Sequence, residues 1–170
     1  MVFTGDGKGK TTAAVGQGLR AAGHGMKVLM IQFMKGPGNV YGEILALRKC
    51  GLVDFRIVQC GRDSFVKRGE PDEEDIQHAR RGLMLAEEAL REGACDMLIL
   101  DEINVAVDYG VVALSEVLEL LTLRPPEVHV VLTGRYAPAE LLERADLVSE
   151  VVERRHHYRE GVAAQPGVEF

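Results

Sequence analysis

Short apolar runs alternate along this chain with segments in which apolar residues recur every three or four positions. The apolar runs have the length of strands, and Val28–Phe33 is apolar enough for a strand that is covered on both faces. Strands are therefore predicted at residues 1–4, 28–33, 54–59, 97–100, 128–132 and 145–152. The first of these is short for a strand that must hold the following loop in place.

Helices are predicted between these strands, at residues 10–22, 41–49, 72–92, 114–121 and 138–144. In the first helix we expect Val15, Leu19 and Ala22 to share the buried face. The helix at 72–92 is the clearest, because its apolar residues are spaced by three or four throughout, at Ile76, Ala79, Leu83, Ala86 and Leu90. Strands that alternate with helices indicate an α/β protein with a mostly parallel sheet.

The length and composition of the chain indicate that these strands and helices form a single domain. A chain of 170 residues that is 46% hydrophobic is the size of one domain with a well-buried core. We expect a single domain over residues 1–170, in which residues 153–170 form a tail without periodicity. Within that tail, His156 and His157 are adjacent and so do not share a helical face, which favours an exposed surface over a metal pair.

Charge and hydropathy exclude several classes of function. The net charge of −6 and the lack of a basic run argue against a nucleic-acid surface. No apolar stretch reaches the roughly 18–20 residues that span a bilayer, so no membrane association and a cytoplasmic protein are expected. Cys50, Cys60 and Cys95 lack paired spacing, so they are expected to be reduced and mostly buried.

The first predicted strand leads into a glycine-rich segment that is typical of a phosphate-binding loop. Backbone amides of Gly5, Asp6, Gly7, Lys8 and Gly9 would face a phosphate at the start of a helix, where Lys10 neutralises oxygens and Thr11, followed by Thr12, offers a hydroxyl to Mg²⁺. The usual spacing would place the first glycine at position 4, where this chain has Thr4. The motif predicts a three-layer P-loop (RecA-like) fold.

Polar residues follow three further strands at the edge where open α/β sheets place ligands. Asp101 and Glu102 end the run at 97–100 and are in the position of a Walker B carboxylate that binds Mg²⁺ beside Thr11. Lys35 lies in the turn at 34–39, and Arg135 follows the strand at 128–132. Either cation is placed to reach a phosphate, although Arg135 is equally placed to pair with a surface acid.

These residues predict binding of a nucleoside triphosphate with Mg²⁺ without saying which atom reacts. A hydrolase or motor, a kinase-like phosphoryl transferase, a transferase that acts elsewhere on ATP, and a non-catalytic nucleotide-dependent switch all remain open. The long polar loop from Cys60 to Pro71, with Phe65 as a lone apolar side chain, is equally well interpreted as functional or as mobile surface.

Six segments together resemble the P-loop type of ATP:corrinoid adenosyltransferases, and they occur in the family's order from end to end. They are residues 4–14, TGDGKGKTTAA; 32–36, QFMKG; 100–102, LDE; 133–135, TGR; 145–150, ADLVSE; and 161–170, GVAAQPGVEF. The glycine loop alone is weak evidence. The QFMKG segment and the C-terminal segment are not shared by P-loop proteins in general, and the shifted first glycine is similar to the family's own loop.

The resemblance implies that a Co(I) corrinoid attacks the 5′ carbon of ATP and releases triphosphate. Lys10, Mg²⁺ on Thr11 with Glu102 or Asp101, and also Lys8, Lys35 and Arg135 would then stabilise the leaving group, with ATP reversed on the loop. It also implies a homodimer, a flavoprotein reductant, and Phe65 as an aromatic wedge that displaces the lower axial ligand of the corrinoid. The chain lacks the tryptophan that family members often have near this position, and the resemblance leaves open whether the corrinoid is incomplete or complete cobalamin.

Overall fold

The computed structural model describes residues 1–38 and 41–169. Asn39, the last residue of the turn predicted at 34–39, and Phe170, the last residue of the C-terminal segment, lie outside the described residues. None of the described helices is both long enough and apolar enough to cross a membrane.

All strands of the described chain run parallel in a single six-stranded sheet of order β3-β2-β4-β5-β1-β6. The strands are β1 Val2–Thr4, β2 Val28–Phe33, β3 Phe55–Cys60, β4 Met97–Asp101, β5 His129–Thr133 and β6 Val148–Glu150. Every predicted strand is confirmed within a residue or two, except that β6 is much shorter than the predicted 145–152. All of β6 is exposed at the sheet edge, so few contacts extend it.

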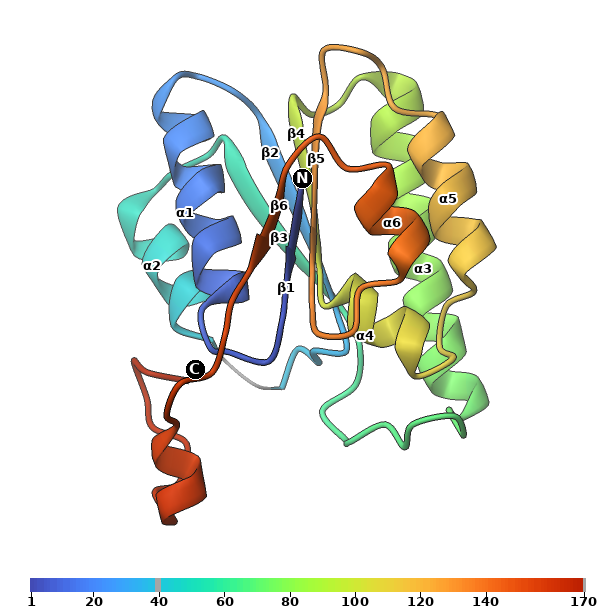
Figure 1. Ribbon diagram of the computed structural model, residues 1–170. Coiled ribbons are helices and arrows are strands. Elements are labelled where there is room, and N and C mark those ends of the chain that lie inside the picture. Colours follow the sequence, from blue (N-terminus) through green and yellow to red (C-terminus); the bar gives the residue numbers. More distant parts are fainter. Residues whose placement is uncertain (39–40, 170) are drawn as a thin grey trace.

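Helices cover both faces of this sheet and make three layers, which confirms the predicted fold class. Helices α1 and α2 lie on one face, and α3, α5 and α6 lie on the other (Figure 1). The helices are α1 Lys10–Gly23, α2 Gly42–Cys50, α3 Glu73–Glu92, α4 Ile103–Asp108, α5 Leu114–Thr122 and α6 Ala139–Glu143, followed by the short 3₁₀ helix η1 His157–Glu160. Neither α4 nor η1 was predicted.

Two apolar cores, one on each face of the sheet, follow from the alternation of side chains along the strands. Met30 and Ile99 pack under α1, while Ile31 and Leu98 pack on the opposite face, and each of the four has no solvent-exposed surface. A strand that is buried on both faces favours apolar residues, which explains why β2 is apolar except for Gln32 and β4 is apolar up to Asp101.

The buried face of α1 differs from the prediction. Ala14, Gly18 and Ala21 are buried, whereas Leu19 is 46% exposed. A β carbon on Gly18 would lie 2.6 Å from the ring of Phe55, so the helix approaches the sheet too closely for large side chains. Small residues therefore form the contact, and only Ala22 of the predicted set is buried.

Helix α3 packs against the other face much as its spacing predicts. Ala79, Ala86 and Leu90 are buried, while Ile76 and Leu83 are only half-buried. The helix begins after Asp72, whose amide donates to the Asp75 carboxylate at 3.1 Å, a contact that stabilises the first turn.

Candidate nucleotide site

The phosphate-binding loop joins β1 to α1 at the carboxyl edge of the sheet. Gly9 has a φ of 120° and comes directly before α1, so the helix starts at Lys10 with its free amides facing the loop. The Lys10 side chain turns back and donates to the carbonyl oxygens of Gly5 and Gly7, each at 2.7 Å. Burial lowers the pKa of Lys10, and nearby Glu102 opposes that shift. The ammonium is thus held at the centre of the loop.

The unusual front end of the loop has a physical reason. The chain leaving β6 crosses directly over it: the Val151 amide donates to the Thr4 carbonyl at 2.8 Å, and the Val151 carbonyl accepts from the Gly7 amide at 2.7 Å. A β carbon on Gly5 would lie 2.5 Å from that Val151 oxygen, and Gly5 also has a φ of 94°. Glycine is therefore needed at position 5 by contact and by conformation.

Asp101, at the end of β4, is the most highly connected side chain of the site and is fully buried. Its Oδ1 accepts from the hydroxyls of Thr11 at 2.8 Å and Thr133 at 2.7 Å. Its Oδ2 accepts from Lys35 Nζ at 2.8 Å and from Gln32 Nε2 at 3.2 Å. One carboxylate therefore links the phosphate-binding loop to the ends of β2, β4 and β5.

Glu102 lies next to Asp101 in a constrained conformation. Its φ is 61°, and its amide donates to the Thr133 hydroxyl at 2.9 Å, so the peptide is fixed before α4 begins. Burial raises the pKa of the Glu102 carboxyl, and the charge of Asp101 raises it further. For Lys35, burial lowers the pKa, but the charge and hydrogen bond of Asp101 more than offset this and the pKa rises. Two acids are thus held together by neighbouring cations.

A cavity of about 780 Å³ opens beside these residues. Most residues predicted for the nucleotide and its Mg²⁺ line it: Gly7, Lys8, Gly9, Lys10, Thr11, Thr12, Lys35, Glu102 and Arg135. Gly5 and Asp6 shape the loop without lining the cavity, and the Asp6 carbonyl accepts from Arg135 Nη2 at 3.2 Å. Asp101 lies behind Thr11. The structure therefore brings the predicted cations and acids to one place.

Several residues of the site were not assigned a role by the sequence. Thr133 binds both Asp101 and the Glu102 amide, and Gln32 also reaches Glu43 at 3.2 Å. A polar residue inside an apolar strand is a signal that could have identified Gln32, since an amide is buried only with partners. Thr133 carries no such signal, because its contact depends on which strands are neighbours.

The C-terminal tail forms one wall of the cavity, which the sequence did not predict. His156, Val168 and Glu169 line it, and His157 Nε2 lies 3.2 Å from Glu169 Oε1. The interpretation of both histidines as exposed surface is wrong, because both are half-buried by the returning tail. Within the described residues, no group of three His, Cys, Asp or Glu side chains is arranged to hold a metal ion.

The loop after β3 is tied down at both ends and exposed in the middle. Arg62 pairs with Asp72 at 3.1 Å, and Arg68 pairs with Asp108 at 2.6 Å. Phe65 lies between these anchors and is fully exposed, outside the cavity lining. The loop follows the carboxyl end of β3 and so lies at the same edge of the sheet as the phosphate-binding loop (Figure 1).

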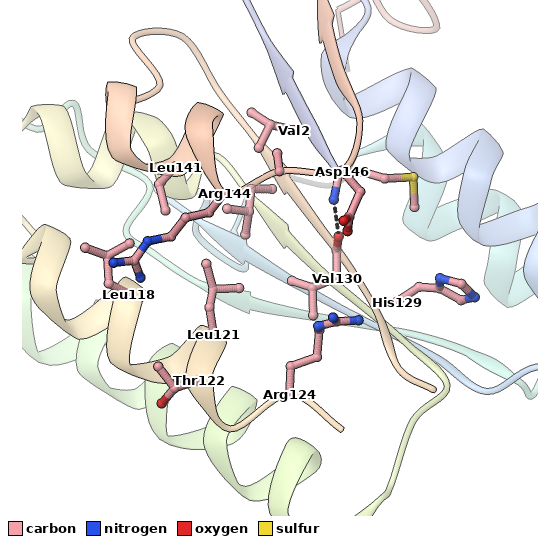
Figure 2. Close-up of a pocket in the computed structure, with 13 residues that line it drawn as sticks. Val2, Leu118, Leu121, Thr122, Arg124, His129, Val130, Leu141, Arg144 and Asp146 are labelled. Atoms are coloured by element: carbon pink, nitrogen blue, oxygen red, sulfur yellow. Dashed lines mark hydrogen bonds between the residues drawn. The ribbon is translucent and has the colours of Figure 1, made fainter. Parts of the chain in front are cut away.

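A second cavity, of about 260 Å³, lies at the opposite edge of the sheet. Figure 2 shows it between α5, α6 and the start of β5, with Leu118, Leu121 and Leu141 around it. His129 and Val130, the first two residues of β5, are part of its lining, so this cavity lies beside the first part of β5. No residue predicted for the nucleotide lines it, so it is not the candidate site.

The donors beside the loop fit Mg²⁺. Thr11 offers a hydroxyl and Asp101 and Glu102 offer carboxylates, which are the oxygen ligands that this ion prefers. Two or three protein oxygens suffice, because Mg²⁺ usually keeps waters and takes further oxygens from substrate phosphates. The Thr11 hydroxyl and Asp101 Oδ1 are already 2.8 Å apart, so these two ligands lie side by side.

Comparison with known proteins agrees with this geometry. The family model described as ATP:corrinoid adenosyltransferase BtuR/CobO/CobP matches residues 1–170. The corrinoid adenosyltransferase of Escherichia coli K12 is 41% identical over all of this chain and 84% of its own length. That of Pseudomonas aeruginosa is 36% identical over all of this chain and 82% of its own, and corrinoid adenosyltransferase CobA of Salmonella typhimurium is 39% identical over all of this chain and 84% of its own.

Proposed function

The chain belongs to the BtuR/CobO/CobP family of ATP:corrinoid adenosyltransferases, and on this basis we propose how its cavity performs the transfer. ATP lies with its phosphates on Gly7–Thr12, in the reversed orientation that directs the 5′ carbon away from the loop. A Co(I) corrinoid attacks that carbon. The cobalt–carbon bond forms with two electrons from cobalt, the bond from the 5′ carbon to oxygen breaks, and its electron pair leaves with triphosphate.

The observation that carries the proposal is the concentration of cations beside the loop. Lys8, Lys10, Lys35 and Arg135 all line the cavity. Negative charge grows on the leaving triphosphate as the carbon–oxygen bond breaks, so cations placed there stabilise the transition state more than the ground state. The reaction needs no general base, because Co(I) itself is the nucleophile. The acids of the site are therefore assigned to metal binding.

We assign Thr11, Asp101 and Glu102 as the residues that hold Mg²⁺. When bound, the ion would neutralise charge on the triphosphate and orient it. The raised pKa of Glu102 fits this role, since the charge of the adjacent, buried Asp101 disfavours its negative charge and a bound cation would stabilise both carboxylates. Thr133 and Gln32 orient Asp101 through its two oxygens.

The corrinoid is assigned to the side of the loop after β3. Phe65 is free to contact a large ligand there, because its side chain packs against nothing in the protein. In this role it would cover the lower face of the corrin and displace the axial ligand, which makes Co(II) easier to reduce. A flavoprotein reductant, a homodimer, a cytoplasmic location and a single domain over 1–170 with the tail 153–170 complete the proposal.

The test is incubation with Mg-ATP and a corrinoid that has been reduced chemically to Co(I). We expect equal amounts of triphosphate and of a light-sensitive adenosylcorrinoid, and no triphosphate when the corrinoid is omitted. Release of ADP and phosphate alone would instead support an ATPase or kinase-like phosphoryl transferase, and nucleotide binding without turnover would support a switch. Parallel reactions with an incomplete corrinoid and with cobalamin identify the preferred substrate.

A further inference from the structure

The Lys35 side chain contacts two of the three groups assigned to Mg²⁺. Its Nζ lies 2.8 Å from Asp101 Oδ2 and 3.5 Å from the Thr11 hydroxyl oxygen. The lysine side chain is 14% exposed and the Asp101 side chain is 0% exposed, so little water screens the pair. A second cation that binds the same two oxygens therefore has to displace this ammonium or overcome its repulsion.

The backbone beneath Lys35 is fixed, so any displacement must come from the side chain. The Lys35 carbonyl accepts from the Gly61 amide at 3.1 Å. A β carbon on Gly61 would lie 2.3 Å from the backbone nitrogen of Lys35, which shows how closely the two chain segments pack. Met34, just before, has a φ of 59°. The four-carbon stem of lysine, in contrast, has several rotatable bonds through which its ammonium can change position.

The cavity offers the Lys35 ammonium a second location. Lys35 lines the same cavity as Lys8, Lys10 and Arg135, and its Nζ lies 5.0 Å from the centre of the Tyr41 ring, which also lines the cavity. A triphosphate in this cavity presents several charged oxygens, each a stronger attraction for a mobile ammonium than bulk water. The side chain therefore has one acceptor at Asp101 and another on a bound triphosphate.

We propose that Lys35 is a placeholder cation in the metal site. Its ammonium neutralises Asp101 and opposes binding of a divalent ion on its own. When the ion arrives together with triphosphate, the ammonium moves from Asp101 to the phosphate oxygens and the ion takes its place. The inference rests on the proposed assignment of Asp101 and Thr11 to the metal. It adds that the metal ion and triphosphate bind cooperatively, because each helps to move the ammonium away from Asp101.

The test measures Mn²⁺ binding by the loss of the free-ion signal in electron paramagnetic resonance, without corrinoid. Wild type should bind Mn²⁺ weakly alone and at least about tenfold more tightly with inorganic triphosphate present. Without triphosphate, Lys35→Met should bind Mn²⁺ at least about tenfold more tightly than wild type, because the variant lacks one opposing charge at contact distance. The same variant should bind metal-free triphosphate about tenfold more weakly.

Controls separate displacement from a general charge effect. Lys8→Met removes a cation that lines the same cavity but, in the described part of the chain, forms no hydrogen bond or ion pair with Asp101. This variant should leave the affinity for Mn²⁺ without triphosphate within about twofold of wild type. In 0.5 M KCl the gain in Lys35→Met should persist, because long-range effects are screened and contact effects are not. Lys35→Gln keeps a donor for Asp101 and replaces Lys35→Met if that variant fails to fold.

An unchanged or weaker affinity of Lys35→Met for Mn²⁺ alone would overturn the proposal, as would wild-type Mn²⁺ binding that does not respond to triphosphate. An equal gain in Lys8→Met and Lys35→Met would overturn it too. None of these measurements depends on adenosyl transfer, so a negative transfer assay and a negative result here are distinguishable.

Discussion

The amide of Gly7 donates to the carbonyl oxygen of Val151 at 2.7 Å, and a β carbon on Gly7 would lie 2.7 Å from the same oxygen. The phosphate-binding loop is thus shaped by a segment from the other end of the chain. Any side chain at position 7 pushes the two segments apart, so the geometry of the loop and the path of the tail are coupled.

Gly7→Ala should weaken ATP binding by about tenfold or more, because backbone atoms must shift to admit the methyl group, a change that typically costs about 1–3 kcal/mol. Binding is measured by isothermal titration calorimetry. Gly16→Ala is the matched control, since a β carbon there meets nothing within 4 Å and Gly16 lies in α1. It should bind ATP normally and be slightly more stable. Equal ATP affinity in both variants would contradict the coupling.

Lys10→Ala should lower turnover by roughly 10² or more, because the ammonium at the centre of the loop would no longer stabilise the leaving triphosphate. Triphosphate release under saturating ATP is the measurement. Lys49→Ala, an exposed lysine near the end of α2, should keep wild-type turnover. Turnover of Lys10→Ala within a few-fold of wild type would remove this residue from the mechanism.

Thr133→Val should reduce stability by about 1–3 kcal/mol, because it leaves the Glu102 amide without its acceptor and Asp101 without a donor in a buried position. It should also raise the Mg²⁺ concentration needed for half-maximal transfer. Urea denaturation and a Mg²⁺ titration measure the two effects. Thr122→Val removes an exposed hydroxyl that bonds the Glu119 carbonyl, and should change stability by no more than about 0.5 kcal/mol.

Phe65→Ala should leave stability within about 0.5 kcal/mol of wild type, because the ring is fully exposed. Transfer that starts from Co(II) and a reductant should fall strongly, while transfer from preformed Co(I) should fall less, since the ring is assigned to the reduction step. Val53→Ala, at a side chain that is 88% exposed, is the control for both measurements. Unchanged transfer in both assays would show that the loop from Cys60 to Pro71 has no role in the reaction.

The three thiols should differ in reactivity at pH 8. Cys50 is exposed, whereas Cys60 and Cys95 are buried, and burial followed by the charge of Asp96 raises the pKa of Cys95 from its ordinary 9.0 to about 11. A thiol reagent read out by peptide mass spectrometry should therefore label Cys50 first. Labelling of Cys95 at the rate of Cys50 would contradict the burial.

The same thiol gives a pH dependence of stability. Between pH 9 and pH 11 the folded protein keeps the Cys95 proton while the unfolded chain releases it, so the free energy of unfolding falls as pH rises through this window. Cys95→Ala should show a shallower fall over that range in urea denaturation. Identical slopes in the two proteins would contradict the shift.

The sequence predicts best where a single segment determines the outcome. Val28–Phe33 is predicted to the residue because both of its faces are buried and every residue except Gln32 is apolar. The buried face of α1 was wrong because the spacing of large residues cannot show that Gly18 meets Phe55. Helix α4 was missed because a six-residue helix is too short to show a 3.6-residue period.

The same distinction holds in the site. The loop residues and the acids after β4 could be predicted, because a glycine motif is local and the carboxyl ends of parallel strands meet at one edge. The contacts of Thr133 with Asp101 and of Val151 with Gly7 could not, because they depend on strand order. The wall formed by His156 and Glu169 depends on the path of a tail that has no periodicity.

The position of β1 between β5 and β6 has a consequence for synthesis of the protein. Strand β1 leaves the ribosome well before β5 and β6, so it waits unpaired until these two neighbours are made. Closing such distant contacts is slow compared with forming local ones. The phosphate-binding loop therefore takes shape only after residue 151 has emerged, and a nascent chain that stalls earlier has no formed pocket for ATP.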